Sequence, residues 1–196
     1  MITDDDYDYF LAAVAVFLLL CCGGESQANL RFIPTEPFQD VQPVVDIPDG
    51  YRQQNWAPYG EGSCVHASMV MILRWQGHPE LADWWRKSFN GGEYPDTMNQ
   101  KLNEAGISFA ETRNGDVEFL EWAIRTRRGA CVTIMGGAHM VCLVGLDDQN
   151  AWILDNNDPH NISRWPRQGF LNEWHNSGHQ WAVTPVFDPP PRKPKL

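Results

Sequence analysis

The last third of the chain contains short apolar runs that follow one another closely. Three of them occupy residues 130–135, 139–146 and 151–154, and they are separated by Gly136-Gly137 and by the polar residues 147–150. Runs of this length, bounded by Gly, Asp and Asn, are typical of strands joined by tight turns. A fourth apolar run covers residues 181–187. This region therefore predicts an antiparallel sheet, with a hairpin between the second and third runs.

Helical patterns come before the sheet. In residues 64–76 the apolar positions Val65, Met69, Ile72 and Leu73 recur at three- and four-residue steps, and Gly77 suits the end of a helix. Residues 79–89, 96–105 and 116–128 predict three further helices, and residues 107–111 predict a short strand. Helices first and an antiparallel sheet last make an α+β domain.

Composition divides the chain into four parts. Residues 51–187 are expected to form the folded domain. Residues 25–50 contain four prolines and are expected to be a linker, and the proline-rich residues 188–196 are expected to be an extended tail. Residues 1–24 contain an apolar segment that is separate from the folded domain.

That segment is short. Residues 10–22 are thirteen residues without a charge. As a helix of about 1.5 Å per residue they span roughly 20 Å, less than the roughly 30 Å hydrocarbon core of a bilayer. We expect an uncleaved transmembrane helix, which would make the protein membrane-associated through a single N-terminal anchor; the sequence leaves the side of the membrane open. A cleaved signal peptide followed by export is one alternative, and a tail buried in a larger membrane-embedded assembly is another.

Charge and cysteine content narrow the classes of function. The formal net charge of −10 argues against a nucleic-acid partner, because phosphate binding requires clustered Lys and Arg. The five cysteines give no disulfide framework. Cys131 and Cys142 lie in apolar runs, where a cysteine usually serves as a small buried hydrophobic residue. Cys64 lies in a different setting.

Cys64 follows Gly60-Glu61-Gly62-Ser63 and begins the first predicted helix. Backbone N–H groups at a helix start, together with the positive end of the helix dipole, stabilise a thiolate and lower its pKa. The same N–H groups can bind a developing oxyanion. Cys64 is therefore a candidate nucleophile, and its alternative is a buried structural cysteine.

A nucleophilic thiol needs a base, and His139 is the candidate. It follows Gly136-Gly137-Ala138 and begins an apolar strand, so that its side chain lies at an edge of the sheet where a helix start can pack. His66 lies two residues after Cys64 and roughly 200° around the same helix, so it cannot face the same way. His179 also precedes an apolar strand, but no polar orienting residue follows it in a further strand.

The base in turn needs a residue that orients its ring and stabilises the imidazolium. Asp155 ends the strand that the hairpin pairs with the His139 strand, and it is the first candidate. Asn156 is the next candidate, because a change of one residue in hairpin register would exchange the two positions. Asn157 and Asp158, which follow directly, are remoter candidates.

These segments resemble the papain-like cysteine peptidases. GSCVHASMVMILR looks like the nucleophile helix of that family, and HMVCLVGLDDQNAWILDN looks like its hairpin between the catalytic His and the orienting residue. The stretch LEWAIRTRRGACVTIMGGAHMVCLVG is closer to the compact bacterial branch, which includes the leader-peptide peptidase domains of peptide exporters. The resemblance covers about residues 53–187.

The resemblance implies a thiol hydrolase that acts through a thioester acyl-enzyme and needs no cofactor. Its expected substrate is a peptide or a small amide. The family places an oxyanion-hole Gln about six residues before the Cys, where this chain has Pro58. Gln54 is the expected substitute, with Gln53 as its rival. The alternative function is a non-catalytic papain-like module in a membrane-tethered assembly.

A metal site is a third hypothesis. Cys64, His66, His139 and Cys142 are all able to bind zinc, but their spacings match no common zinc pattern. We therefore expect no metal.

Overall fold

A computed structural model describes residues 44–56 and 63–187, which all belong to one unit of the chain, Val41–Leu196. In these residues one antiparallel sheet has the strand order β1-β6-β2-β3-β4-β5. The strands are β1 (Phe109–Thr112), β2 (Ala130–Ile134), β3 (His139–Leu146), β4 (Asn150–Leu154), β5 (Ile162–Pro166) and β6 (Ala182–Pro185). The predicted α+β class is confirmed, while the apolar N-terminal segment and the tail lie outside the described residues.

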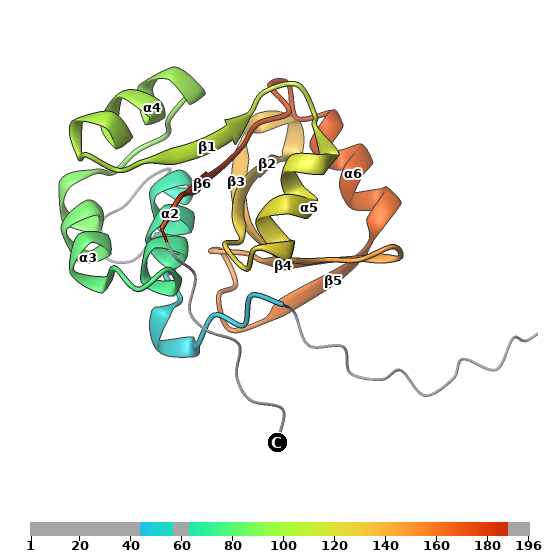
Figure 1. Cartoon of the computed structure of the whole chain (residues 1–196), viewed down its shortest axis with the longest axis horizontal. Helices are drawn as coiled ribbons and strands as arrows, with labels where there is room; N and C mark the ends of the chain where they lie inside the picture. The colour runs from blue at the N-terminus through green and yellow to red at the C-terminus, as the bar shows by residue number, and fades with distance from the viewer. Residues whose placement is uncertain (1–43, 57–62, 188–196) are drawn as a thin grey trace, which may run out of the picture. The chain divides into compact units, whose positions relative to one another are not determined.

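The helices are α2 (Cys64–Trp75), α3 (Pro79–Ser88), α4 (Pro95–Glu104), α5 (Val117–Arg125) and α6 (Arg167–His175), with the short 3-10 turns η1 (Asp49–Tyr51) and η2 (Met135–Gly137). In Figure 1 the strands β2 and β3 lie between α2 on one side and α5 and α6 on the other. Helix α2 contacts β3, β2 and β6, and it also packs against α3. Strand β3 is thereby in the middle of the domain, with its first residue close to the start of α2.

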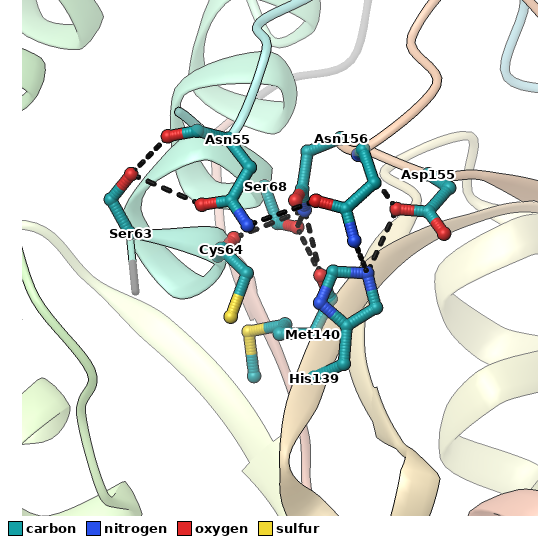
Figure 2. A network of polar contacts seen from close by, with 9 residues as sticks. Asn55, Ser63, Cys64, Ser68, His139, Met140, Asp155 and Asn156 are labelled. Carbon is teal, nitrogen blue, oxygen red and sulfur yellow. Dashed lines mark hydrogen bonds and ion pairs between the residues drawn. The ribbon is translucent and has the colours of Figure 1, made fainter. Parts of the chain in front are cut away.

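Helix α2 is buried on almost all of its faces, so it contributes many residues to the core. Eleven of its twelve residues are buried, and Arg74 is the exception among them. Strand β3 is also nearly continuous in burial, as expected for a strand covered on both faces. The long apolar stretches of these two elements thus bury each other, and their first residues, Cys64 and His139, lie near one another (Figure 2).

The hairpin between β3 and β4 forms as predicted. Asp147 closes its turn, since its Oδ1 accepts hydrogen bonds from the backbone N–H groups of Gln149 (2.8 Å) and Asn150 (2.7 Å). Leu154 at the end of β4 pairs with Cys142. Residues after Leu154 are therefore carried toward the beginning of β3, where His139 lies.

Two elements were not expected from the sequence. Strand β5 and helix α6 follow β4, and α6 packs against β2, β4 and β5 through Phe170, Leu171 and Trp174. The core also includes Val45 and Ile47, which lie in the range expected as linker and are fully buried. The backbone N–H of Val45 donates to the Val144 carbonyl (2.9 Å), so the packed domain takes in residues before position 51.

Among the residues that the structure describes, no helix is both long enough and apolar enough to cross a bilayer.

Candidate active site

Cys64 is the first residue of α2, and its side chain is nearly buried, with 8% of the residue exposed. The turn before it is held by Ser63, whose hydroxyl donates to the backbone carbonyl of Asn55 and lies 3.2 Å from the Asn55 Oδ1. The Ser63 carbonyl accepts the first backbone hydrogen bond of the helix, from Ala67 (2.8 Å). The sulfur therefore lies at the positive end of the helix dipole, as the sequence predicts.

His139 is the first residue of β3 and is 7% exposed. Its Nε2 lies 2.8 Å from Asp155 Oδ1. Because an ionised carboxylate only accepts hydrogen bonds, Nε2 carries the proton and donates it to Asp155. Figure 2 shows the other ring nitrogen, Nδ1, turned toward the side of Cys64. The structure thus brings Cys64, His139 and Asp155 together in the order that acyl transfer by a thiol requires.

The pKa of Cys64 is lowered in this arrangement. Burial alone would raise it, but a hydrogen bond with His139 and the backbone N–H groups of Met140 and Val65 favour the thiolate and bring the pKa below the ordinary 9.0. These N–H groups belong to the start of β3 and to the first turn of α2. The Cys64 thiol is therefore more acidic than an equally buried cysteine without these hydrogen bonds would be.

The pKa of His139 moves in the opposite direction. Burial lowers it, but the hydrogen bonds with Asp155 and Cys64 outweigh burial and raise the pKa to about 9. The pKa of Asp155 is lowered. Burial raises this pKa, but hydrogen bonds from the His139 ring and from the backbone N–H of Asn157, which donates to Asp155 Oδ1 at 2.8 Å, outweigh burial. A protonated His139 ring therefore favours the ionised forms of both Cys64 and Asp155.

Asn156, the alternative orienting residue, points into the protein instead of toward His139. Its side chain is fully buried, and its Nδ2 donates to the carbonyls of Met140 (2.7 Å) and Cys64 (3.2 Å) and to the Ser68 hydroxyl (2.9 Å). This amide links the start of α2 to the start of β3, which carry the sulfur and the imidazole (Figure 2). The structure gives Asn156 a scaffolding position and gives the contact with His139 to Asp155.

Gln54, the expected oxyanion donor, is exposed and is absent from the residues lining the cavity at Cys64. Its backbone carbonyl accepts a hydrogen bond from the side chain of Gln53, its rival (3.2 Å). Gln54 lies on the surface because the side chain of the next residue, Asn55, is buried in the protein. Asn55 is 4% exposed, and nothing in the sequence pattern distinguished it from the neighbouring polar residues.

A cavity of about 390 Å³ opens beside the sulfur and the imidazole. Its other walls come from the α3–α4 connection (Gly92, Glu93 and Tyr94), from the segment that leads to His139, and from Trp181. A second hollow of similar size, at Asn103–Phe109, contains no cysteine or histidine. Only the first of these two can place a carbonyl group against the Cys64 sulfur.

His66 lies away from Cys64, as its helical position predicts. It is fully buried, where its Nδ1 accepts a hydrogen bond from Trp85 Nε1 (3.1 Å) and its Nε2 lies 3.2 Å from Glu93 Oε1. Lys101 Nζ also lies 3.2 Å from that oxygen. Burial lowers the pKa of His66 to about 4, although Glu93 acts to raise it, so this imidazole is neutral at physiological pH.

The other hypothetical metal ligands do not gather either. Within residues 44–56 and 63–187, no three His, Cys, Asp or Glu side chains form a group that could hold a metal ion. Cys142 donates to the backbone carbonyl of Ser68 (3.4 Å) and pairs across the sheet with Cys131, and both thiols are fully buried.

Comparison with solved structures identifies the fold. The chain is similar to the crystal structure of a protein described as a C39-like peptidase from Bacillus anthracis, with a TM-score of 0.54 and 15% sequence identity, over 74% of this chain and 98% of that one. The domain therefore has the papain-like fold of these peptidases.

A second match is the double glycine motif protease of an AMS/PCAT transporter, solved in complex with a leader peptide. The match covers 63% of this chain and 84% of that one, with 16% sequence identity and a TM-score of 0.42. No protein-family model matches the sequence, and no curated protein matches it.

Proposed function

We propose that this protein is a cysteine peptidase of papain-like fold, with Cys64 as nucleophile, His139 as general acid and base, and Asp155 as the residue that orients His139. The observation that carries the proposal is the row of three side chains. Nε2 of His139 donates to Asp155 at 2.8 Å, and the same ring forms a hydrogen bond with the Cys64 thiol, whose pKa is lowered. A structural histidine has no need of an acidic thiol on its other side.

The proposed reaction begins with the Cys64 thiolate attacking the carbonyl carbon of a peptide bond. A new C–S bond forms, and the electron pair of the carbonyl moves to its oxygen. Backbone N–H groups in the first turn of α2 face this developing charge at the positive end of the helix dipole. Because His139 holds its proton up to a pH of about 9, an imidazolium is present next to the thiolate when the substrate arrives.

The tetrahedral intermediate then collapses. The C–N bond breaks, and His139 gives its proton to the leaving amine, which leaves a thioester on Cys64 and a neutral imidazole. Water, deprotonated by that imidazole, attacks the thioester. The acid product leaves, and the thiolate and imidazolium are restored. Asp155 keeps the proton of Nε2 in place through both steps, so that Nδ1 always faces the reaction.

The peptide substrate is supported by the shared fold with a C39-like peptidase and by the cavity beside Cys64. Small-amide hydrolysis and acyl transfer pass through the same thioester, so the triad alone does not distinguish them. The expected membrane anchor in residues 10–22 is part of the proposal: it would hold the peptidase domain at a membrane. Comparing membrane fractions of the full chain and of a chain lacking residues 1–24 tests this part.

The experiment for the peptidase is cleavage of a diverse peptide mixture, followed by mass spectrometry of both peptides and protein. Cys64→Ser should abolish cleavage, and Cys142→Ala should keep it, because Cys142 is buried in the sheet away from the cavity. An activated ester should add its acyl group to Cys64 of the wild type, and hydroxylamine should remove it. Cleavage that survives in Cys64→Ser, or a wild type that neither cleaves nor is acylated, contradicts the proposal.

A further inference from the structure

One buried side chain connects the loop that carries Asp155 with the turn that precedes Cys64. Asn55 is 4% exposed and lies in the segment before the nucleophile helix. Figure 2 shows it between Ser63 on one side and the Asp155–Asn156 loop on the other. Neither the peptidase mechanism proposed above nor the family resemblance assigns it a role.

The contacts of Asn55 with the acid loop are specific. Its backbone N–H donates to the carbonyl of Asn156 (2.8 Å), and its side-chain Nδ2 donates to Asn157 Oδ1 (3.0 Å). Asn157 in turn donates its backbone N–H to Asp155 Oδ1, the same oxygen that accepts the proton of His139 Nε2. A continuous path of polar contacts therefore leads from Asn55 to the imidazole.

Asn55 is also fixed from the other side. Its carbonyl accepts hydrogen bonds from the Ser63 hydroxyl and from Arg86 Nη2 (2.9 Å), and its Oδ1 lies 3.2 Å from the same hydroxyl. Arg86 is buried on α3, so it ties Asn55 to the helical part of the domain. The Asn55 amide thus has its donor on the loop that follows β4 and its acceptor on the turn before α2.

We infer that Asn55 is a positioning residue, which holds the Asp155–Asn157 loop in register with the nucleophile and acts on His139 through Asn157 and Asp155. The inference rests on the proposed function, because it needs a working Cys64–His139 pair. Without the Nδ2 contact, Asp155 has more freedom to move away from Nε2. The imidazolium then loses stabilisation, and the thiolate that depends on it becomes less favourable.

The test is the rate of Cys64 alkylation by iodoacetamide from pH 5 to pH 9, located on Cys64 by mass spectrometry. Three variants remove the contact. Asn55→Ala removes the whole amide, and Asn55→Asp keeps an acceptor for Ser63 but loses the donor. Asn157→Ala removes the partner at an exposed position. Each should lower the alkylation rate at pH 6 by about tenfold, equivalent to one pH unit in the thiol pKa. With a cleavable peptide, kcat should fall by about tenfold while KM stays within about twofold.

Gln76→Ala is the matched control. Gln76 is also a buried amide, which donates to Arg128 and Thr184, but it lies at the other end of α2, roughly 18 Å from Cys64. It should lose stability without changing the alkylation profile. The inference is overturned if Asn157→Ala or Asn55→Asp keeps the wild-type profile, or if Gln76→Ala changes it equally. His139→Ala distinguishes failure of the Asn55 inference from failure of the proposed function. If His139→Ala also leaves the alkylation profile unchanged, the proposed function itself is wrong.

Discussion

Replacing Asp155 by asparagine removes the charge that faces His139 and changes little in size or shape. Asp155 Oδ1 lies 2.8 Å from His139 Nε2, and its side chain is 33% exposed. The asparagine can still accept a hydrogen bond from Nε2, but it can also present its NH₂ group to the ring, which favours the wrong tautomer. Both effects weaken the imidazolium on which the thiolate depends.

The size of the effect follows from the pKa of His139. Raising that pKa from 6.5 to about 9 corresponds to about 3 kcal/mol, because each pH unit is worth about 1.4 kcal/mol. Cys64 supplies part of this, and water screens the partly exposed Asp155 carboxylate, so we assign about 2 kcal/mol to the carboxylate. Asp155→Asn should therefore lower the pKa of His139 by about 1 to 2 pH units and reduce kcat/KM by at least roughly 30-fold.

Two measurements follow the substitution. Nitrogen NMR of the imidazole as a function of pH gives the pKa of His139, and peptide cleavage gives kcat/KM. Asp158→Asn is the control, since it removes the same charge three residues away, from a side chain that is exposed and bonded to Asn161. An unchanged pKa of His139 in Asp155→Asn, or an equal change in Asp158→Asn, would refute the reasoning.

Three further predictions concern the scaffold around the site. Asn156→Ala removes three buried hydrogen bonds and should lower the free energy of unfolding by about 3 kcal/mol in urea denaturation, more than Asp155→Asn does. Gly137→Ala should lower the unfolding midpoint, equivalent to about 1 to 3 kcal/mol, and slow Cys64 alkylation, because Gly137 has a φ of 91° and an added Cβ would lie 2.8 Å from the Ser177 carbonyl oxygen. The unfolded chain protonates His66 below a pH of about 6.5, whereas folded His66, with its lowered pKa, does so only below about 4, so stability should fall as the pH drops through this window. In thermal denaturation His66→Gln should flatten that dependence between pH 6.5 and pH 4, and an unchanged slope would contradict it.

The elements that carry the proposed site were predictable because their patterns are strong and local. The α2 periodicity and the apolar run of β3 gave boundaries within a residue of those observed. The hairpin turn at Asp147 fixes which residues meet across β3 and β4, and it carries Asp155 back to His139. The proximity of these residues was predictable for that reason, while their catalytic roles remain predictions.

Other features depend on contacts that one sequence does not reveal. Helix α6 has a weakly apolar pattern, with Phe170, Leu171 and Trp174 among polar residues, and only packing against the sheet stabilises it. The choice between Asp155 and Asn156 required the actual register, since neighbouring residues face opposite ways. Gln54 was expected at the oxyanion on the basis of a family position, but burial of the next side chain, Asn55, turns Gln54 to the surface.

The central claim is that Cys64 is a thiolate because His139 stands beside it as an imidazolium. The most direct measurement is the rate of Cys64 alkylation by iodoacetamide near pH 6, in the wild type and in His139→Ala, with His179→Ala as the control. Cys64 should be labelled rapidly in the wild type and in the control, and in His139→Ala as slowly as an ordinary buried thiol. Equal rates in the wild type and in His139→Ala would contradict it.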